Sequence, residues 1–462
     1  MGHFNKTRKK RQKDQGKNKT GKVTKHNEKG PSIFMRGSIV GSVRNNKKIM
    51  KNIEKLKNYK TYSVQDNLGI FLPASDQRKS GRCWIFAFLN ILRIKTISHY
   101  NIHPSFSFSP SYLYFWDQYE KSKYFLEQIS KKSHYSLENF DNYFLFHKMI
   151  SDGGTWNMLQ NIVNKYGVVP YENMKESHHS INTREFKGLL YNKLKSCAKE
   201  IRESKKTSHK SLIQKHMKSI YTIMVKCFGT PPSKIKVTLN NTTHMVTPQM
   251  YYQHMIRRIE GNDVNQKINF LNAPHLKYNT YYGIKSLNNM DNKNTCVYFN
   301  VTFEDFKEII LNSLHKNIPV WFGSDYDKQN VMNEAMMNTQ IDNFSKLESS
   351  LKDKSLFLKK ENAIPYFQTN INHAMIIDGY YKDKRDKIQF WSIENSHNSK
   401  LKSLSFENNH GKVTMSEDWF KENAVIAAVD ICCVNNKTML SKIKDKKSIH
   451  YLPEWSNLGE LL

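Results

Sequence analysis

Cysteine is scarce in this sequence. Six cysteines occur in 462 residues at irregular spacing, and none belongs to a Cys-x-x-Cys pair. Thiols so few and so scattered exclude the disulfide framework that holds small secreted domains together. The His and Cys spacings typical of zinc sites are also missing, so we predict no metal site and no cofactor. Free cysteines are expected in a reducing compartment.

Long hydrophobic runs are missing as well. No stretch of 18 apolar residues occurs, so nothing in the sequence predicts a transmembrane helix. The N-terminus lacks the apolar core of a signal peptide. Hydrophobic residues make up 38% of the chain and aromatic residues 12%, enough to bury a sizeable core. We therefore expect a soluble, cytoplasmic protein.

Acidic residues are outnumbered by basic ones. The chain has 41 Asp and Glu against 72 Lys and Arg, a net charge of +31. Residues 1–30 are rich in Lys and Arg and contain only Asp14 and Glu28 as acids, so we expect residues 1–34 to be a disordered tail. The tail is a nuclear-import segment, a weak nucleic-acid-binding or other polyanion-binding segment at residues 1–30, or a solvated extension. The rest of the chain has no basic motif interleaved with aromatics, so sequence-specific base recognition is not supported.

Helix-like patterns precede strand-like patterns along the chain. The predicted helices cover residues 84–97, 106–129 and 152–170, and a polar, Lys-rich stretch at about 175–290 predicts a helical insertion. The strand-like runs are 295–301, 318–324, 373–381, 388–396 and 424–434. Helices followed by strands favour an α+β fold with two lobes.

The stretch SDQRKSGRCWIFAFLN places Cys83 where a polar loop becomes an apolar helix. Unpaired N–H groups and the helix dipole at such a position favour a thiolate with a depressed pKa. Gln77, six positions upstream, is placed to donate an N–H to an oxyanion together with the backbone N–H of Cys83. The alternative is that Cys83 is an inert core cysteine and Gln77 a surface residue.

A nucleophilic thiol needs a base, and the base needs a group that fixes its tautomer. His373 opens one predicted strand and Asn395 ends the next, with a turn at 382–387 between them. The two strands of a hairpin run antiparallel, so these residues are expected to lie side by side at one end of a sheet. Taken singly, His373 is an ordinary strand histidine and Asn395 a turn residue.

Together these segments resemble the bleomycin hydrolase and aminopeptidase C family, a papain-like branch of the cysteine peptidases. The resemblance is carried by DQRKSGRCWIF, NHAM and WSIENS, and it extends through DGGTWNMLQNIVNKYGVVP, PVWFGSD and LPEWSNLGELL, so that it covers about residues 35–462. It implies a papain-like fold in which a helical lobe buries the Cys83 helix and the second lobe is an antiparallel, barrel-like sheet. The separation of Cys83 and His373 is about twice the ~130–150 positions of plain papain-like enzymes, which the helical insertion explains.

The resemblance also assigns roles to individual residues. Cys83 becomes the nucleophile, His373 the general acid and base, Asn395 the residue that orients it, and Gln77 the oxyanion donor. Substrate binding is assigned to Asp152, Gly153, Gly154 and Asn372, and to Leu462, whose carboxylate ends a C-terminal arm (451–462) that reaches into the cleft.

The function implied is that of a cysteine aminopeptidase that hydrolyses peptides and peptide-like amides through a thioester, as a homohexamer. One departure concerns the residue after Asn-Ser, which is Trp in the family and His397 here. The family indole shields the His–Asn hydrogen bond from water, so we expect the imidazole to lack that aromatic cover here and to be held less firmly. The alternative function is a polyanion-binding or scaffolding homologue with weak or lost activity.

Overall fold

The computed structural model describes residues 56, 58–148, 150–239, 242–285, 287–291, 295–331, 335–339, 357–397, 412–445 and 448–459. The predicted tail at 1–34 and the terminal Leu462 lie outside them. Among the described helices, none is both long enough and apolar enough to cross a membrane.

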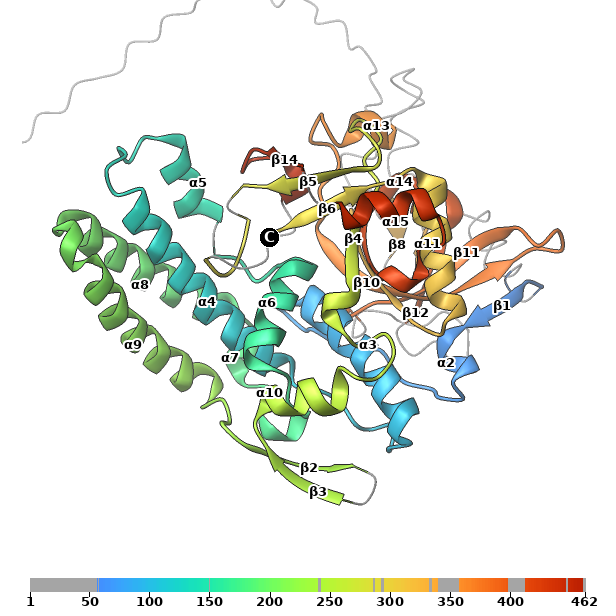
Figure 1. Cartoon of the computed structure of the whole chain (residues 1–462), viewed down its shortest axis with the longest axis horizontal. Coiled ribbons are helices and arrows are strands. Elements are labelled where there is room, and N and C mark those ends of the chain that lie inside the picture. The colour runs from blue at the N-terminus through green and yellow to red at the C-terminus, as the bar shows by residue number, and fades with distance from the viewer. Residues whose placement is uncertain are drawn as a thin grey trace, which may run out of the picture.

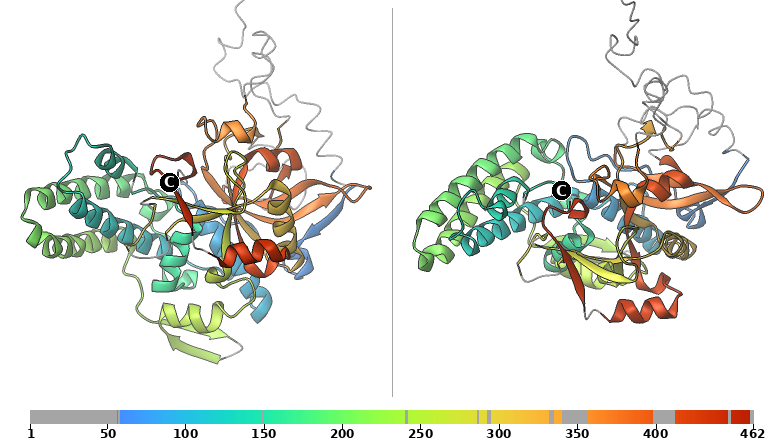
Figure 2. Two further views of the ribbon diagram at one scale, coloured as in Figure 1. Left: turned by 45° about the horizontal axis from the view of Figure 1, so that its top comes forward. Right: turned by 90° about the horizontal axis from the view of Figure 1, so that it is seen from above.

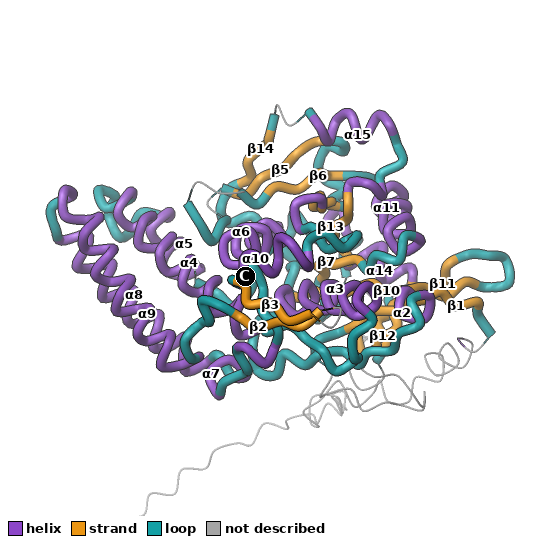
Figure 3. Tube along the Cα trace, turned by 60° about the horizontal axis from the view of Figure 1, so that its bottom comes forward, coloured by secondary structure: helices purple, strands orange, loops and turns teal. Residues whose placement is uncertain are grey.

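The long helices α4, α8 and α9 lie on one side of the molecule, and the large sheet lies on the other together with helices α11, α14 and α15, as Figure 1 and the two views of Figure 2 show. The long helices α4, α8 and α9 lie side by side, and the tube in Figure 3 shows them apart from the strands. Helix α3 lies between this group and the sheet and packs on β7 and β10. The described helices are α2 (Val64–Asn67), α3 (Cys83–Tyr100), α4 (Pro110–Lys131), α5 (Phe140–Lys148), α6 (Trp156–Tyr166), α7 (His178–Ile181), α8 (Arg184–Glu203), α9 (His209–Phe228), α10 (Pro248–Tyr251), α11 (Phe303–His315), α13 (Lys360–Ala363), α14 (Glu417–Asn423) and α15 (Lys437–Lys444).

The strands form one large sheet and a separate hairpin. The hairpin is β2 (Ile235–Leu239) with β3 (Thr242–Val246). In the large sheet the order is β14 (Ile449–Leu452), β5 (Thr280–Ile284), β6 (Val297–Asn300), β4 (Lys267–Leu271), β13 (Ala424–Asp430), β7 (Val320–Ser324), β10 (His373–Lys382), β11 (Ile388–Glu394), β12 (Lys412–Ser416), β9 (Met336–Met337) and β8 (Asn330–Val331), with β1 (Lys60–Ser63) paired to β10.

The strand predictions agree with β6, β7, β10, β11 and β13, and the hairpin predicted from His373 and Asn395 is confirmed as the antiparallel pair β10–β11. The fold is a combination of helices with a mixed sheet, because β4–β6, β5–β14 and β9–β12 are parallel. The expectation of a purely antiparallel sheet is therefore wrong at these three pairs. The order of the described strands runs from an edge at β14 to an edge at β8, without the pairing that would close a barrel.

The predicted insertion at about 175–290 contains helices α8 and α9, as expected, but its C-terminal boundary needs correction. Strands β4 and β5 lie inside that range and pair in the large sheet. The β2–β3 hairpin also interrupts it. The long helices of this range therefore end at Phe228, short helical turns follow the hairpin at 248–256, and the lysines that favoured helix at 234–236 lie at the start of the hairpin instead.

Local sequence explains where the helices around the site begin and end. Ser109 accepts a hydrogen bond from the Tyr112 N–H (3.1 Å) and Pro110 follows it, a combination that starts α4. Thr155 caps α6 in the same way, through the Met158 N–H. Helix α6 ends at Gly167, whose φ of 73° lies in the left-handed region that glycine adopts without strain.

The core around the first turn of α3 is tightly packed. Trp84 is fully buried, and its indole N–H donates to the backbone oxygen of Asp152 (2.7 Å). Gly154 lies against the same indole, so that a Cβ at this position would meet Trp84 carbons at 2.8 Å. The glycine therefore lets the 152–154 segment approach α3 closely.

We predict that Gly154→Ala destabilises the protein by about 1–3 kcal/mol, because an overpacked core must shift to accept the methyl group. The midpoint of urea unfolding measures the effect. Gly188→Ala is the matched control, since Gly188 is exposed in α8 and its added Cβ meets nothing within 4 Å. That control should stabilise the helix by ~0.5–1 kcal/mol. Equal midpoints for the two variants would contradict the packing argument.

Candidate active site

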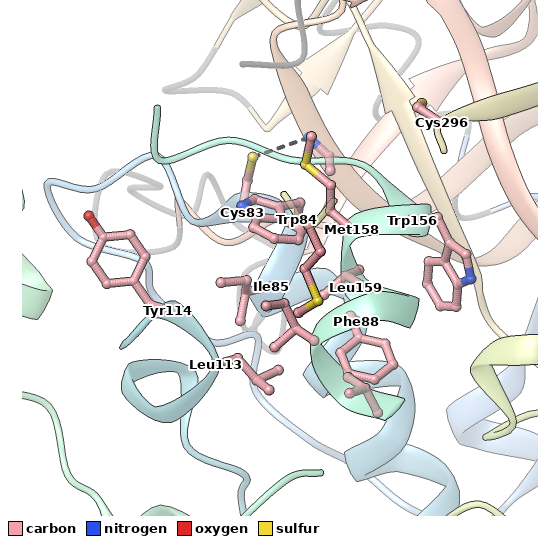
Figure 4. Packing of buried hydrophobic residues seen from close by; sticks show 14 of the residues in the cluster. Cys83, Trp84, Ile85, Phe88, Leu113, Tyr114, Trp156, Met158, Leu159 and Cys296 are labelled. Atoms are coloured by element: carbon pink, nitrogen blue, oxygen red, sulfur yellow. Dashed lines mark hydrogen bonds between the residues drawn. The ribbon is translucent and has the colours of Figure 1, made fainter. Parts of the chain in front are cut away.

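Cys83 is the first residue of α3, directly after the loop that the sequence predicts. Its N-cap residue, Arg82, makes no side-chain cap, so the N–H groups of the first turn stay directed at the helix end. The backbone N–H of Ala374, the second residue of β10, donates to the Cys83 sulfur (3.4 Å). Figure 4 shows this sulfur at the rim of the apolar cluster, with a dashed line to that nitrogen. Residues far apart in the sequence thus meet at the thiol.

His373 and Asn395 lie side by side at one end of the β10–β11 hairpin. His373 Nε2 is 2.8 Å from Asn395 Oδ1, and both residues are buried. An amide oxygen only accepts, so Nε2 carries the proton and Nδ1 is left as the basic nitrogen. His373 directly precedes Ala374, whose N–H contacts the Cys83 sulfur. The imidazole therefore branches from the residue next to that contact.

Gln77 is tied to the same cluster. Its backbone N–H donates to the Ser396 carbonyl (2.9 Å), and its side-chain oxygen accepts from the Ser396 hydroxyl (2.5 Å). Its amide nitrogen donates to the Ser80 carbonyl in the loop before α3. Gln77 is 3% exposed, so the alternative of a surface glutamine is wrong. The structure therefore brings all four predicted residues, Cys83, His373, Asn395 and Gln77, into one neighbourhood.

Burial sets the protonation of the thiol and the imidazole. It raises the pKa of Cys83 to about 11, although the N–H groups of Ala374, Trp84 and Cys83 itself lower the pKa. Burial, and then the neighbouring His397, lower the pKa of His373 to about 3. The depressed thiol pKa expected from the helix terminus is therefore wrong for Cys83 taken alone, because desolvation outweighs three dipoles. The two charges compensate each other only when they form together, by transfer of the thiol proton to His373.

Asp152 supports the loop in front of Cys83. Its carboxylate accepts from the Gly81 N–H (3.2 Å), the Tyr114 hydroxyl (2.7 Å) and the Thr183 hydroxyl. Gly153 accepts from the buried amine of Lys121 through its backbone oxygen (2.5 Å). The carboxylate of Asp152 is thus hydrogen-bonded within the protein. If residues 152–154 bind substrate as predicted, their backbone groups are the ones available for it.

Comparison with known proteins agrees with this geometry. The model of the peptidase C1-like family matches residues 19–459. The chain belongs to the peptidase C1-like family. The match starts within the predicted tail of residues 1–34. Membership of this family identifies the protein as a cysteine-type peptidase. The resemblance stated from the sequence is thereby confirmed.

Three relatives show how far the similarity reaches. Aminopeptidase C of Lactobacillus delbrueckii subsp. lactis is 28% identical over 415 residues, which cover 87% of this chain and 88% of that protein. Bleomycin hydrolase of Gallus gallus is 28% identical over 436 residues, 86% and 90% of the two chains. The crystal structure of PepW from Lactobacillus rhamnosis HN001 superposes on this chain with a TM-score of 0.75 at 26% identity. The match covers 83% of this chain and 86% of the PepW chain.

Asn372, a predicted substrate-binding residue, has its side chain engaged by the loop after β7. Its Oδ1 accepts from the Tyr326 N–H (2.8 Å), and its Nδ2 donates to Asp325 (3.2 Å) and Asp327 (3.0 Å). The structure thus shows a loop-holding contact for Asn372. The predicted substrate role stays a prediction.

Two further residues contact His373: Tyr326, which the sequence analysis did not place in the site, and His397, which it names as a departure from the family. The ring of Tyr326 lies 4.8 Å from the His373 ring, and the Tyr326 hydroxyl accepts from Asn395 Nδ2 (2.9 Å). The ring of His397 stacks on His373 at 4.7 Å and 16°. The expectation that the imidazole lacks an aromatic cover is therefore wrong. The β7–β10 pairing would have pointed to Tyr326, since Ser324 is the register partner of His373, but the sequence does not give strand order.

The cysteines other than Cys83 are dispersed over the described chain. All six cysteines are free thiols. Among the residues that the structure places, no group of three or more His, Cys, Asp or Glu side chains is arranged to hold a metal ion.

Glu394 links the strand of Asn395 to the helix of Cys83. It accepts a hydrogen bond from Asn90 Nδ2 on α3, and Asn90 in turn contacts Ser75 (2.7 Å) at the start of the loop that contains Gln77. Burial, and then Asp378, raise the pKa of Glu394 to about 7, while Lys412 and Arg93 lower it. The carboxyl is therefore more readily protonated in the folded chain than in the unfolded one.

A pH dependence follows for Glu394. Its pKa rises from an ordinary 4.5 to about 7 on folding, so its contribution to stability is present below pH 4.5 and is lost as the pH rises through 7. We predict that Glu394→Gln is more stable than the wild type above pH 7, by on the order of 3 kcal/mol, with no difference near pH 4. Urea unfolding between pH 4 and 8 measures this. Glu308→Gln, at an exposed position on α11, is the control, and parallel curves for wild type and Glu394→Gln would overturn the assignment.

Proposed function

We propose that this peptidase is a cysteine aminopeptidase that removes N-terminal residues from peptides and peptide-like amides. The observation that carries the proposal is the convergence of the Cys83 sulfur, the Ala374 N–H and the His373–Asn395 pair at the first turn of α3. The names of the relatives, aminopeptidase C and bleomycin hydrolase, support the exopeptidase activity.

The chemistry follows from the placement of each group. His373 Nδ1 takes the thiol proton as the Cys83 sulfur attacks the substrate carbonyl carbon, so thiolate and imidazolium form together. The N–H groups at the start of α3 and the amide of Gln77 stabilise the oxyanion. His373 then protonates the leaving amine, and a thioester remains on Cys83. Water, deprotonated by His373, hydrolyses the thioester and restores the thiol.

Activity against aminoacyl fluorogenic amides tests the proposal. The wild type should hydrolyse these substrates and leave N-blocked counterparts intact, and Cys83→Ala should lose at least about 10³-fold in kcat. Cys296→Ala is the matched control, because Cys296 is equally buried but lies outside the site and should keep wild-type activity. Full activity in Cys83→Ala, or preferential cleavage of N-blocked substrates, would reject the proposed function.

The C-terminal arm is proposed to give the exopeptidase its specificity. Asn457, near the end of the described chain, donates to the carbonyls of Ile364 and Thr369 (3.2 Å for the latter), and Leu458 is buried. This anchors the arm to the segment that leads into His373. A terminal carboxylate beyond this anchor suits a substrate's free α-ammonium, because a charge-assisted hydrogen bond is among the stronger ones. Leu462 itself lies outside the described residues.

We predict that deleting residues 460–462 converts exopeptidase activity into endopeptidase activity, since the cleft loses both its block and its counter-charge. Mass spectrometry of the products from a free and an N-acetylated peptide measures the change. Leu462→Ala keeps the chain length and the carboxylate, so it should release single residues as the wild type does. The same products before and after the deletion would refute the role of the arm.

The family resemblance further implies a papain-like arrangement in two lobes, a homohexamer and a cytoplasmic location, and we include these in the proposal. Exposed aromatic side chains at Phe140, Tyr143 and Trp455 supply an apolar surface suited to contacts between subunits. A polyanion-binding homologue without activity is less well supported, because Cys83, His373 and Asn395 are all present and in contact with one another or with neighbouring backbone.

A further inference from the structure

Two aromatic rings, each from a residue just after a different strand, pack against the catalytic imidazole. Tyr326 follows β7 and His397 follows β11, and their ring centres lie 4.8 and 4.7 Å from that of His373. The two rings are 6.3 Å from each other. Tyr326 and His373 are each 3% exposed, so little water reaches the His373–Asn395 hydrogen bond. A hydrogen bond screened in this way is electrostatically stronger than one in water.

The hydroxyl of Tyr326 also holds the Asn395 amide, whose orientation is fixed by the His397 N–H, a group that can only donate. Asn395 Nδ2 donates to this hydroxyl oxygen (2.9 Å), while Oδ1 accepts from His373 Nε2 (2.8 Å) and from the His397 N–H (3.1 Å). If the amide turned over, its NH₂ group would face His373 Nε2, and the imidazole would have to carry its proton on Nδ1. That tautomer cannot accept the thiol proton.

Tyr326 is itself held from the strand that carries His373. Asn372 accepts the Tyr326 N–H (2.8 Å) and binds both flanking carboxylates, Asp325 and Asp327. Ser324, two residues before Tyr326, pairs with His373 in the sheet register. The distance between ring and imidazole is thus fixed by backbone pairing as well as by side-chain contact.

We propose that Tyr326 is a positioning residue for the peptidase reaction, and that Tyr326 and His397 together take the place of the single indole found in the family. The inference rests on the proposed function, because it assigns a role within that reaction. It explains how a chain with His397 instead of Trp keeps its imidazole oriented and screened. The ring of Tyr326 supplies the cover, and its hydroxyl supplies a contact to Asn395 that an indole ring carbon does not.

Tyr326→Phe tests the hydroxyl, because the ring is kept and one hydrogen bond of Asn395 is lost. We expect kcat to fall about tenfold with KM unchanged, since a buried N–H is left without an acceptor. Tyr281→Phe is the matched control. Tyr281 is also buried and donates its hydroxyl to a backbone carbonyl, that of Ile443 (2.8 Å), but it lies on β5, which β6, β4, β13 and β7 separate from β10. An equal fall in kcat/KM in Tyr326→Phe and Tyr281→Phe would show that the Tyr326 hydroxyl has a merely structural role, and it would overturn the proposal.

A second readout needs no substrate turnover. The rate at which iodoacetamide alkylates Cys83, followed by mass spectrometry across pH 5–9, reports the thiolate–imidazolium pair directly. Among the described titratable side chains, Tyr326 after β7 and His397 after β11 contact the His373 ring, and the Cys83 sulfur at the start of α3 accepts from the N–H of the next residue, Ala374. Weaker orientation by Asn395 destabilises the imidazolium, so in Tyr326→Phe the alkylation curve should move toward higher pH by about one pH unit.

The outcomes separate the two proposals. If aminoacyl amides are not cleaved but the alkylation curve moves in Tyr326→Phe and not in Tyr281→Phe, the proposed function fails and the positioning role stands. If the wild type cleaves them and Tyr326→Phe matches it in both kcat and alkylation, the positioning role is rejected alone. Should Tyr326→Phe not fold, Asn372→Ala releases the Tyr326 N–H at an exposed position and should move the curve in the same direction; an unmoved curve there rejects the role equally.

Discussion

The structure depends on how the first turn of α3 is fixed against the sheet. Trp84 donates to the backbone of Asp152 (2.7 Å) and accepts, through its own backbone oxygen, from the indole of Trp321 on β7 (3.1 Å). This packing places the preceding residue, Cys83, against the N–H of Ala374 at the start of β10. Every other contact of the site, from Gln77 to Asn395, is made by loops and strand ends that this packing brings together.

The same packing determines the electrostatics. The site is so well buried that neither a lone thiolate nor a lone imidazolium is stable there, as the opposite pKa changes of Cys83 and His373 show. The charged state is therefore accessible only as a pair, in which each ion replaces the water that the other has lost. The N–H groups around the sulfur and the oxygen of Asn395 stabilise that pair from both ends.

Much of the site was predictable from the sequence because its members lie in local patterns. A thiol at a loop-to-helix boundary, and a His and an Asn at matching ends of a hairpin, can each be read from a short window. The contribution of Tyr326 could not, because it depends on β7 lying next to β10, and strand order is a long-range property. For the same reason the parallel pairs of β4 and β5 were missed. The thiol pKa was wrong because a helix terminus is visible in the sequence, whereas the depth of burial is not.

The most direct test of the account is the order in which a thiol-directed epoxide labels the six free cysteines near neutral pH. Cys432 is exposed and Cys83 is only 5% exposed, so accessibility alone favours Cys432. An accessible thiolate–imidazolium pair predicts the opposite, with Cys83 labelled first and the preference abolished in His373→Ala. Labelling of Cys432 ahead of Cys83, or a Cys83 rate that is indifferent to the loss of His373, would contradict the pairing on which the account rests.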